Sequence, residues 1–343
     1  MKALLLTEYN KLVYTDVPDP EPSENEVLIN VKACGICGSD IHGLDGSTGR
    51  RIPPLIMGHE ASGIIVAKGR AVTSWNEGDR VTFDSTVFPL NDWYTLEGMY
   101  NLSDKREVLG VSPGNYKRNG AFAEYVVVPD HILYRIPDTV SFEQAAMVEP
   151  AAVALHAVGI AAMRPGQSSV VIGAGMIGSF ILKILKLSGV PEIIAIDLSN
   201  DKLVKARKFG ATRVYNASTD NLSEIIVSLL HNRGADIAFE AVGMDSSLNL
   251  AIDLLRKGGK AVLVGNLSPS VRFPLQKVVT RELKILGSCA IRGEYESALD
   301  LMEKGLLSVD DQISAVAPLS EGAEWFRRLK ENPGELDKVI LVP

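Results

Sequence analysis

Short apolar runs separated by turn-forming residues characterise the chain up to about residue 150. Glu26–Lys32, Gly63–Ala67 and Glu124–Val128 are runs of this kind, and each is rich in β-branched residues. Runs of about five such residues between turn signals are typical of β-strands. The pattern therefore predicts a mostly β unit in the first part of the chain.

From about residue 168 the pattern changes to apolar strands that alternate with helical segments. The predicted strands are 168–173, 192–197, 235–240, 260–265 and 282–287, and the predicted helices are 176–190, 201–209 and 246–257. Strands that alternate with helices of this length indicate βαβ units and a parallel sheet. Two short helices and a closing strand at 338–342 complete the prediction.

A glycine motif lies between the first predicted strand and helix of this second region. Gly173, Gly175 and Gly178 form the pattern GxGxxG, and Asp197 ends the next strand. The first glycine allows a tight turn, the second lets a pyrophosphate approach the backbone, and the third lets the helix pack on the strand. This context predicts a dinucleotide site rather than an ordinary glycine-rich turn.

Asp197 determines which nucleotide the motif favours. A carboxylate at this position accepts hydrogen bonds from the ribose hydroxyls and repels a 2′-phosphate. The residues that follow, Leu198, Ser199 and Asn200, provide no cation for such a phosphate. We therefore expect NAD rather than NADP, although a solvated strand end or a helix cap is an alternative role for Asp197.

Composition and charge narrow the class of protein. The chain has 343 residues, which suggests two domains, and 46% of them are apolar, which is enough for a large core. Its net charge of −7 argues against nucleic acid as a partner. The sequence shows neither a signal peptide nor an apolar stretch long enough for a membrane span, so a cytoplasmic enzyme is the expectation.

A group of potential metal ligands lies in the first region. Cys34 and Cys37 form a CxxC that is followed by Ser39, Asp40 and His42, and His59, Glu60 and Glu149 come later in the chain. A lone CxxC is also found in redox pairs and in half of a zinc finger, but the chain has only three cysteines and no second CxxC. A catalytic zinc needs three N, S or O ligands and an exchangeable water, which Cys, His and Glu can provide.

These motifs together resemble the zinc-containing medium-chain dehydrogenases, over essentially the whole chain and most closely in the sorbitol, polyol and threonine branch. Glu77–Val81, Gly120–Tyr125 and Glu149-Pro150 match as well. The resemblance implies an α/β protein with a GroES-like, mostly β catalytic domain at 1–148, completed by 288–343. A Rossmann domain with a doubly wound parallel sheet is implied at 149–287.

The resemblance also implies roles for individual residues. Cys37 and His59 would hold the zinc, and either Glu60 or Glu149 would complete the set of ligands. Ser39 would take the hydroxyl proton and His42 would pass it to solvent. Asp40 would orient the site. The expected contacts of NAD are Gly173, Gly175, Met176, Ile177, Gly178, Asp197, Lys202, Val242 and Gly265. For Lys202, an exposed position on a helix is an equal alternative.

The chain departs from its relatives in a lobe at 88–103. Many of them bind a structural zinc there through four cysteines, but the matching positions here are Pro89, Asp92, Thr95 and Ser103. We therefore expect one catalytic zinc per chain and no structural zinc. The lobe is predicted to be held by packing of Trp93, Tyr94, Leu96, Tyr100 and Leu102.

Two further departures concern the substrate. Gly43 follows His42 where a sorbitol dehydrogenase has an aromatic residue, and Ala290 replaces its substrate-binding arginine. Arg50, Arg51 and Arg292 are expected to be solvated, with recognition of a phosphorylated polyol as the alternative. Cys34 and His156 are expected to be packed core side chains.

The predicted function is transfer of a hydride between NAD and a small alcohol or carbonyl substrate, with the secondary hydroxyl of a polyol or sugar-like molecule favoured. A primary-alcohol or aldehyde dehydrogenase, also for aromatic substrates, is an alternative, and a catalytically silent nucleotide-binding protein is another. We expect no nucleic acid or membrane partner. We expect the protein to form a homodimer or a homotetramer.

Overall fold

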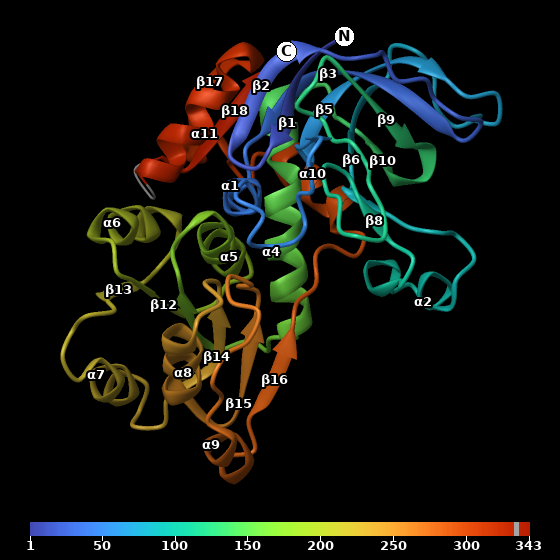
Figure 1. Cartoon of the computed structure of the whole chain (residues 1–343). Coiled ribbons are helices and arrows are strands. Elements are labelled where there is room, and N and C mark those ends of the chain that lie inside the picture. Colours follow the sequence, from blue (N-terminus) through green and yellow to red (C-terminus); the bar gives the residue numbers. More distant parts are fainter. Residues whose placement is uncertain (333–335) are drawn as a thin grey trace. The chain divides into compact units, whose positions relative to one another are not determined.

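The computed structural model describes residues 1–332 and 336–343 (Figure 1). The chain forms two compact units. The first unit contains Met1–Glu149 and Ile291–Pro343, and the second contains Pro150–Ala290. The sequence predicts boundaries at 148/149 and 287/288. None of the helices in the described ranges is long and apolar enough to cross a membrane.

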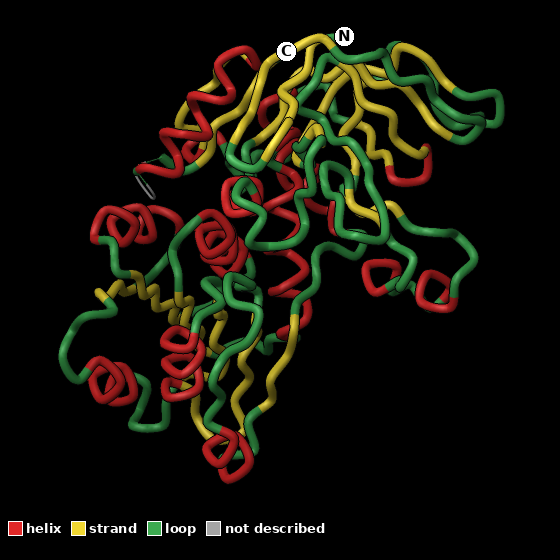
Figure 2. The backbone as a smooth tube through the Cα atoms, in the orientation of Figure 1, coloured by secondary structure: helices red, strands yellow, loops and turns green. Residues whose placement is uncertain are grey.

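The first unit is built around a seven-stranded sheet (Figure 2). Its strands pair in the order β10-β6-β5-β3-β18-β17, and β9 also pairs with β3. The bounds are β3 (Glu26–Gly35), β5 (Glu60–Lys68), β6 (Arg80–Phe83), β9 (Tyr125–Pro129), β10 (Leu133–Arg135), β17 (Ile313–Pro318) and β18 (Lys338–Val342). Alternate residues of β3 are buried until its last three, which are all buried and lead into the site.

Smaller elements surround this sheet. The first unit also contains two smaller sheets. Their strands are β1 (Lys2–Glu8), β2 (Lys11–Asp16), β4 (Leu55–Ile56), β7 (Thr86–Val87) and β8 (Glu107–Val108). The helices are α1 (Gly38–Gly43), α2 (Trp93–Leu96), α3 (Phe142–Ala146), α10 (Glu294–Glu303) and α11 (Gly322–Glu331), with single 3₁₀ turns at Tyr100–Leu102, Asp130–Ile132, Asp310–Gln312 and Leu319–Glu321. Phe122 and Phe326, both buried, meet edge to face in the core at 5.6 Å.

The second unit contains a six-stranded, wholly parallel sheet in the order β13-β12-β11-β14-β15-β16. The strands are β11 (Ser168–Ile172), β12 (Glu192–Asp197), β13 (Arg213–Asn216), β14 (Ala235–Glu240), β15 (Leu255–Leu263) and β16 (Lys284–Gly287). The helices are α5 (Met176–Leu187), α6 (Asn200–Phe209), α7 (Leu222–Leu229), α8 (Asp245–Leu254) and α9 (Leu275–Thr280), and α4 (Val148–Ala161) begins in the first unit. The strand order reverses between β11 and β14, and ligands of such sheets bind at the carboxyl ends beside this point.

Helices cover both faces of this sheet. Val170 and Ile172 of β11 share an apolar core with Leu222 and Ile226 of α7 and with residues of α8. Because side chains alternate along a strand, Val171 faces the opposite side, where α5 contacts β11 and β12, and α6 contacts β12. Both faces of β11 are therefore buried, which explains its continuous apolar sequence.

Several predicted boundaries were wrong. The helix predicted at 176–190 ends at Leu187, because Gly189 adopts a left-handed conformation with φ of 72°. The helix predicted at 246–257 ends at Leu254, and the next strand begins directly at Leu255. The strands β13 and β17 were missed because their side chains are half-buried or exposed over most of their length and lack a strong apolar pattern.

Candidate active site

Three potential metal ligands converge where β3 ends and β5 begins. The Sγ atom of Cys37, a ring nitrogen of His59 and a carboxylate oxygen of Glu60 all lie within 4.8 Å of one another. The antiparallel pairing of β3 with β5 places Gly35 opposite Glu60, which brings the two loops together. A Cβ atom at Gly35 would lie 2.4 Å from Oε2 of Glu60, so only glycine leaves room for this carboxylate.

The donor set fits a zinc ion. Thiolate, imidazole and carboxylate are the usual zinc ligands in proteins. A ligating histidine also directs its other ring nitrogen to a carboxylate, and Nδ1 of His59 faces Oδ1 of Asp40 at 3.5 Å. Burial alone would lower the pKa of His59, but the charges of Asp40 and Cys37 outweigh it and raise that pKa well above its usual range. A metal ion must therefore displace a proton from this ring when it binds.

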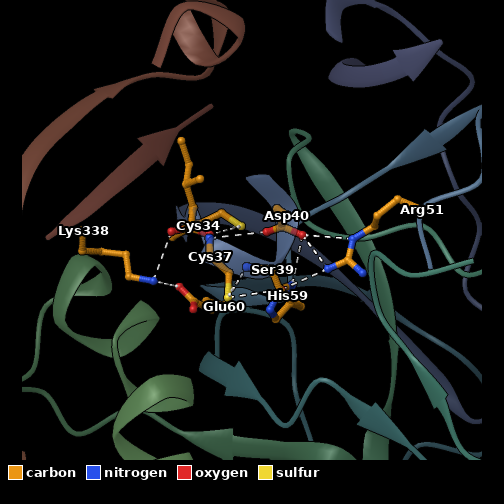
Figure 3. A network of polar contacts seen from close by, with 10 residues as sticks. Cys34, Cys37, Ser39, Asp40, Arg51, His59, Glu60 and Lys338 are labelled. Atoms are coloured by element: carbon orange, nitrogen blue, oxygen red, sulfur yellow. Dashed lines mark hydrogen bonds and ion pairs between the residues drawn. The ribbon is translucent and has the colours of Figure 1, made fainter. Parts of the chain in front are cut away.

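Asp40 is the centre of a polar network that Figure 3 shows from close by. Its Oδ1 accepts hydrogen bonds from Nε of Arg51 at 3.2 Å and from Nη2 at 2.8 Å, and its Oδ2 accepts one from the backbone N–H of Cys37 at 3.4 Å. Burial alone would raise the pKa of Asp40, but His59 and Arg51 hold it well below its usual range. The expectation that Arg51 is solvated was wrong, since its side chain is only 4% exposed.

A second buried cation approaches the group from the opposite side (Figure 3). Nζ of Lys338 donates to Oε2 of Glu60 at 2.5 Å and to the carbonyl of Ile36 at 3.2 Å. Burial lowers the pKa of Lys338, but the Glu60 carboxylate outweighs this effect and raises it. The sequence analysis missed Lys338. It could have been noticed because Lys338 is the first residue of a strand whose other residues are all apolar.

Glu149 lies in the first turn of α4, half-buried and outside the group of three ligand atoms. Loss of water around its carboxyl raises the pKa of Glu149 to about 7, and the charge on Glu60 adds to the rise while His59 opposes it. A cation beside Glu149 would reverse this effect and favour the charged form.

Ser39 and His42 lie on the short helix α1 that Cys37 caps. The hydroxyl of Ser39 donates to Sγ of Cys37 at 3.2 Å and accepts from Nη2 of Arg51 at 3.2 Å. Ser39 and His42 are both exposed and are three residues apart, so they share one face of the helix. Cys34 is buried in the preceding strand and His156 is buried in α4, as expected for packed side chains.

The glycine motif occupies the carboxyl end of β11. Gly173 has a φ of 92°, and a Cβ atom at Gly178 would lie 1.8 Å from the carbonyl oxygen of Gly173. A Cβ atom at Gly175, in contrast, would meet nothing within 4 Å. Helix α5 begins at Met176 without a side-chain cap, which suits the binding of an anion by Met176, Ile177 and Gly178.

The other predicted nucleotide contacts lie around this turn. Asp197 accepts hydrogen bonds from the N–H groups of Ala174 at 2.7 Å and Ser199 at 2.8 Å, and Lys202 lies half-buried in the first turn of α6. Val242 contacts the Gly173 position, and a Cβ atom at Gly265 would lie within 2.4 Å of the Val242 backbone. Sequence reasoning missed Glu240, whose buried carboxylate accepts from the N–H groups of Val242 at 2.9 Å and Gly243 at 2.8 Å.

Hydrogen bonds hold the lobe at 88–103 together. Asp92 accepts from the N–H of Thr95 at 2.7 Å and from the hydroxyl of Ser103, so it joins two of the other three positions that match zinc-binding cysteines. Tyr100 donates to Asp84 at 2.7 Å and stacks on Phe88. The predicted apolar packing was wrong in part, because three of its members are 39–74% exposed, namely Trp93, Leu96 and Leu102.

A Cys–His–Glu group beside a hydroxyl, together with a parallel sheet that carries a GxGxxG turn, defines a zinc-dependent, nicotinamide-linked dehydrogenase. Residues 23–138 match the family described as alcohol dehydrogenase GroES-like domain, and residues 177–304 match zinc-binding dehydrogenase. D-xylulose reductase A of Aspergillus oryzae is 33% identical over 341 residues, which are 97% of this chain and 94% of the relative.

Solved structures agree with this result. Galactitol-1-phosphate dehydrogenase from Escherichia coli matches with a TM-score of 0.92 at 27% identity, and the match covers 100% of both chains. A short chain alcohol dehydrogenase from E. coli CFT073 complexed with NADH matches with a TM-score of 0.93 at 29% identity, covering 100% of this chain and 99% of the other. The chain belongs to the zinc-dependent, NAD(H)-linked alcohol dehydrogenases of the medium-chain family. The predicted family, fold class and enzyme class are thereby confirmed.

Proposed function

We propose that this enzyme oxidises a secondary hydroxyl of a polyol or sugar-like alcohol and transfers the hydride to NAD. The observation that carries the proposal is the Cys37–His59–Glu60 group with Glu149 on the adjoining helix, because these donors suit one catalytic zinc. The names of the D-xylulose reductase and of the galactitol-1-phosphate dehydrogenase support a polyol-type substrate.

Residues of the first unit bind the zinc, orient its ligands and accept the proton of the alcohol. A zinc ion held by Cys37, His59 and either Glu60 or Glu149 would polarise the alcohol oxygen and lower its proton affinity. Asp40 orients His59 for this task. Ser39 accepts the hydroxyl proton as it releases its own hydrogen to water, and His42, on the same exposed face of α1, passes a proton to solvent.

The residues of the second unit bind NAD. The turn at Gly173 and Gly175 and the N-terminus of α5 hold the pyrophosphate. Each oxygen of Asp197 accepts one backbone hydrogen bond and keeps a second lone pair, which is available to a ribose hydroxyl. The same carboxylate disfavours the 2′-phosphate of NADP.

We further propose that each chain holds one zinc. The matching positions of a structural zinc site provide no thiolate, and the carboxylate of Asp92 already accepts hydrogen bonds from the backbone N–H of Thr95 and the hydroxyl of Ser103. Assembly as a cytoplasmic homodimer or homotetramer also remains a prediction, which size-exclusion chromatography and cell fractionation test.

A kinetic panel tests the function directly. We expect zinc-loaded enzyme to reduce NAD with xylitol, sorbitol or butane-2,3-diol at a higher kcat/KM than with ethanol or benzyl alcohol, as followed by NADH absorbance. The variant Cys37→Ser should be inactive, because it removes the thiolate ligand. A preference for simple primary alcohols contradicts the polyol assignment, and no oxidation of any substrate supports a catalytically silent protein.

A further inference from the structure

Arg51 is a buried arginine that bridges the two halves of the catalytic machinery. Its Nη2 donates both to Oδ1 of Asp40 at 2.8 Å and to Oγ of Ser39 at 3.2 Å, and its Nε donates to the same Asp40 oxygen. Asp40 faces the ligand His59, whereas Ser39 is the first group of the proposed proton relay. One guanidinium therefore touches both the support of the metal site and the path of the proton (Figure 3).

The contact with Asp40 compensates a charge that is fully buried. Asp40 is 0% exposed, and a carboxylate without water is costly unless a cation and hydrogen bonds satisfy it. Because Oδ1 lies beside His59 and Oδ2 accepts the N–H of Cys37, the position of this carboxylate affects both ligand loops. Two N–H groups of Arg51, at Nε and Nη2, both donate to Oδ1 and fix that position.

The contact with Ser39 sets the direction of a proton. A guanidinium only donates hydrogen bonds, so the Ser39 oxygen must use a lone pair toward Arg51 and point its own hydrogen elsewhere. In the structure that hydrogen is directed at Sγ of Cys37. A second lone pair of Ser39 is left to accept the proton of the alcohol, while Ser39 releases its own hydrogen to water on the path to His42.

The surrounding residues are arranged to place Arg51. A Cβ atom at Gly43 would lie 2.4 Å from Cγ of Arg51, so the absence of a side chain at 43 gives the arginine its space. Ser112 fixes the backbone on both sides, because its N–H donates to the carbonyl of Arg50 at 3.0 Å and its hydroxyl accepts from the N–H of Ile52 at 2.8 Å. The neighbouring Arg50 is exposed, which makes it a matched control.

We propose that Arg51 is a positioning residue that holds Asp40 against the zinc ligands and orients the Ser39 hydroxyl for proton transfer. The Ser39 part rests on the proposed function, whereas the Asp40 part concerns the metal site alone. Lysine at this position keeps the charge but lacks the fork of donors, so Arg51→Lys separates the two parts.

The test compares Arg51→Gln, Arg51→Lys and Arg50→Gln in the full chain. Zinc affinity is measured by competition with a chromophoric chelator, the absorption spectrum is recorded after cobalt replaces zinc, and kcat and KM are determined with the best alcohol of the panel. For Arg51→Gln we expect roughly 10–100-fold losses in zinc affinity and in kcat, a changed cobalt spectrum and an unchanged KM for NAD. Arg51→Lys should recover most of the zinc affinity but little of kcat, and Arg50→Gln should match the wild type.

Wild-type zinc affinity, cobalt spectrum and kcat in Arg51→Gln would overturn the proposal. A lower unfolding temperature without any change in spectrum or kcat would also overturn it, because it would show a purely structural role. If Arg51→Gln does not fold, Arg51→Lys decides, since wild-type kcat in that variant contradicts the orienting role. If the wild-type enzyme oxidises no alcohol, the proposed function fails, whereas zinc affinity and the cobalt spectrum still test the contact with Asp40.

Discussion

Lys338→Met tests the buried ion pair between Lys338 and Glu60. The two side chains are only 2% and 1% exposed, and 2.5 Å separates Nζ from Oε2. Methionine fills a similar volume but leaves the Glu60 carboxylate without its cation. Removing one partner of a buried pair costs about 3–5 kcal/mol. At about 2–4 °C for each kcal/mol in a unit of this size, the unfolding temperature should fall by on the order of 10 °C.

The size of this loss should depend on zinc. If Glu60 lies beside the bound ion, a divalent cation supplies part of the charge that Lys338 no longer provides. We therefore expect the full loss in metal-free protein and a clearly smaller one in zinc-loaded protein. Thermal unfolding followed by circular dichroism, with and without EDTA, measures both values.

Two further variants show whether charge compensation is the cause. Lys304→Met removes an exposed partner of Asp300 and should change the free energy of unfolding by about 1 kcal/mol or less. The double variant Glu60→Gln with Lys338→Met removes both charges and should be more stable than Lys338→Met alone. Equal stabilities of Lys338→Met and Lys304→Met, or a double variant no more stable than the single one, would refute the reasoning.

Three other predictions follow from the site. NAD should give a higher kcat/KM than NADP. The variant Asp197→Gly should lower the ratio of the two kcat/KM values by about tenfold or more, because a charged hydrogen-bond acceptor is lost. Equal kcat/KM values for NAD and NADP in the wild type would contradict the role of Asp197. Ser39→Ala should lose about 10²–10⁴-fold in kcat, and His42→Ala should lose less and respond to added imidazole; a wild-type rate in Ser39→Ala removes that hydroxyl from the relay. Elemental analysis should find one zinc per chain, and chelation should abolish turnover while the circular dichroism spectrum is largely kept; two tightly bound ions would contradict the assignment of the lobe at 88–103.

Local motifs made the nucleotide turn predictable from the sequence. Gly173 and Gly178 are required by backbone geometry within a few residues, so their spacing carries the information. The grouping of Cys37, His59 and Glu60 was likewise predictable, because the ligands occur in two short motifs. Element boundaries were less predictable where tertiary contacts decide them, as at Leu255, where a strand follows a helix without a loop.

Long-range contacts explain what the sequence could not indicate. Arg50 and Arg51 are identical neighbours in a glycine-rich loop, but only Arg51 is buried. The difference in burial has two causes. Gly43 leaves space for the Arg51 side chain, and Ser112 holds the backbone of Ile52, from which it is 60 residues away in sequence. Lys338 lies 278 residues from Glu60, and only the pairing of β18 with β3 brings them together.

The charges at the site explain why a divalent cation suits it. Asp40 and Glu60 are buried carboxylates, and each has its own buried cation, Arg51 or Lys338. These four charges cancel, so once His59 has lost its proton, a Cys37 thiolate and an ionised Glu149 leave a net charge of two negative units. That is the charge which Zn²⁺ neutralises. Without the ion, the pKa of Glu149, raised to about 7 chiefly by loss of water, leaves that carboxyl protonated in about half of the molecules at neutral pH, which avoids part of the excess negative charge. Zinc uptake should therefore release protons from the site, so zinc affinity should rise with pH through the range around 7.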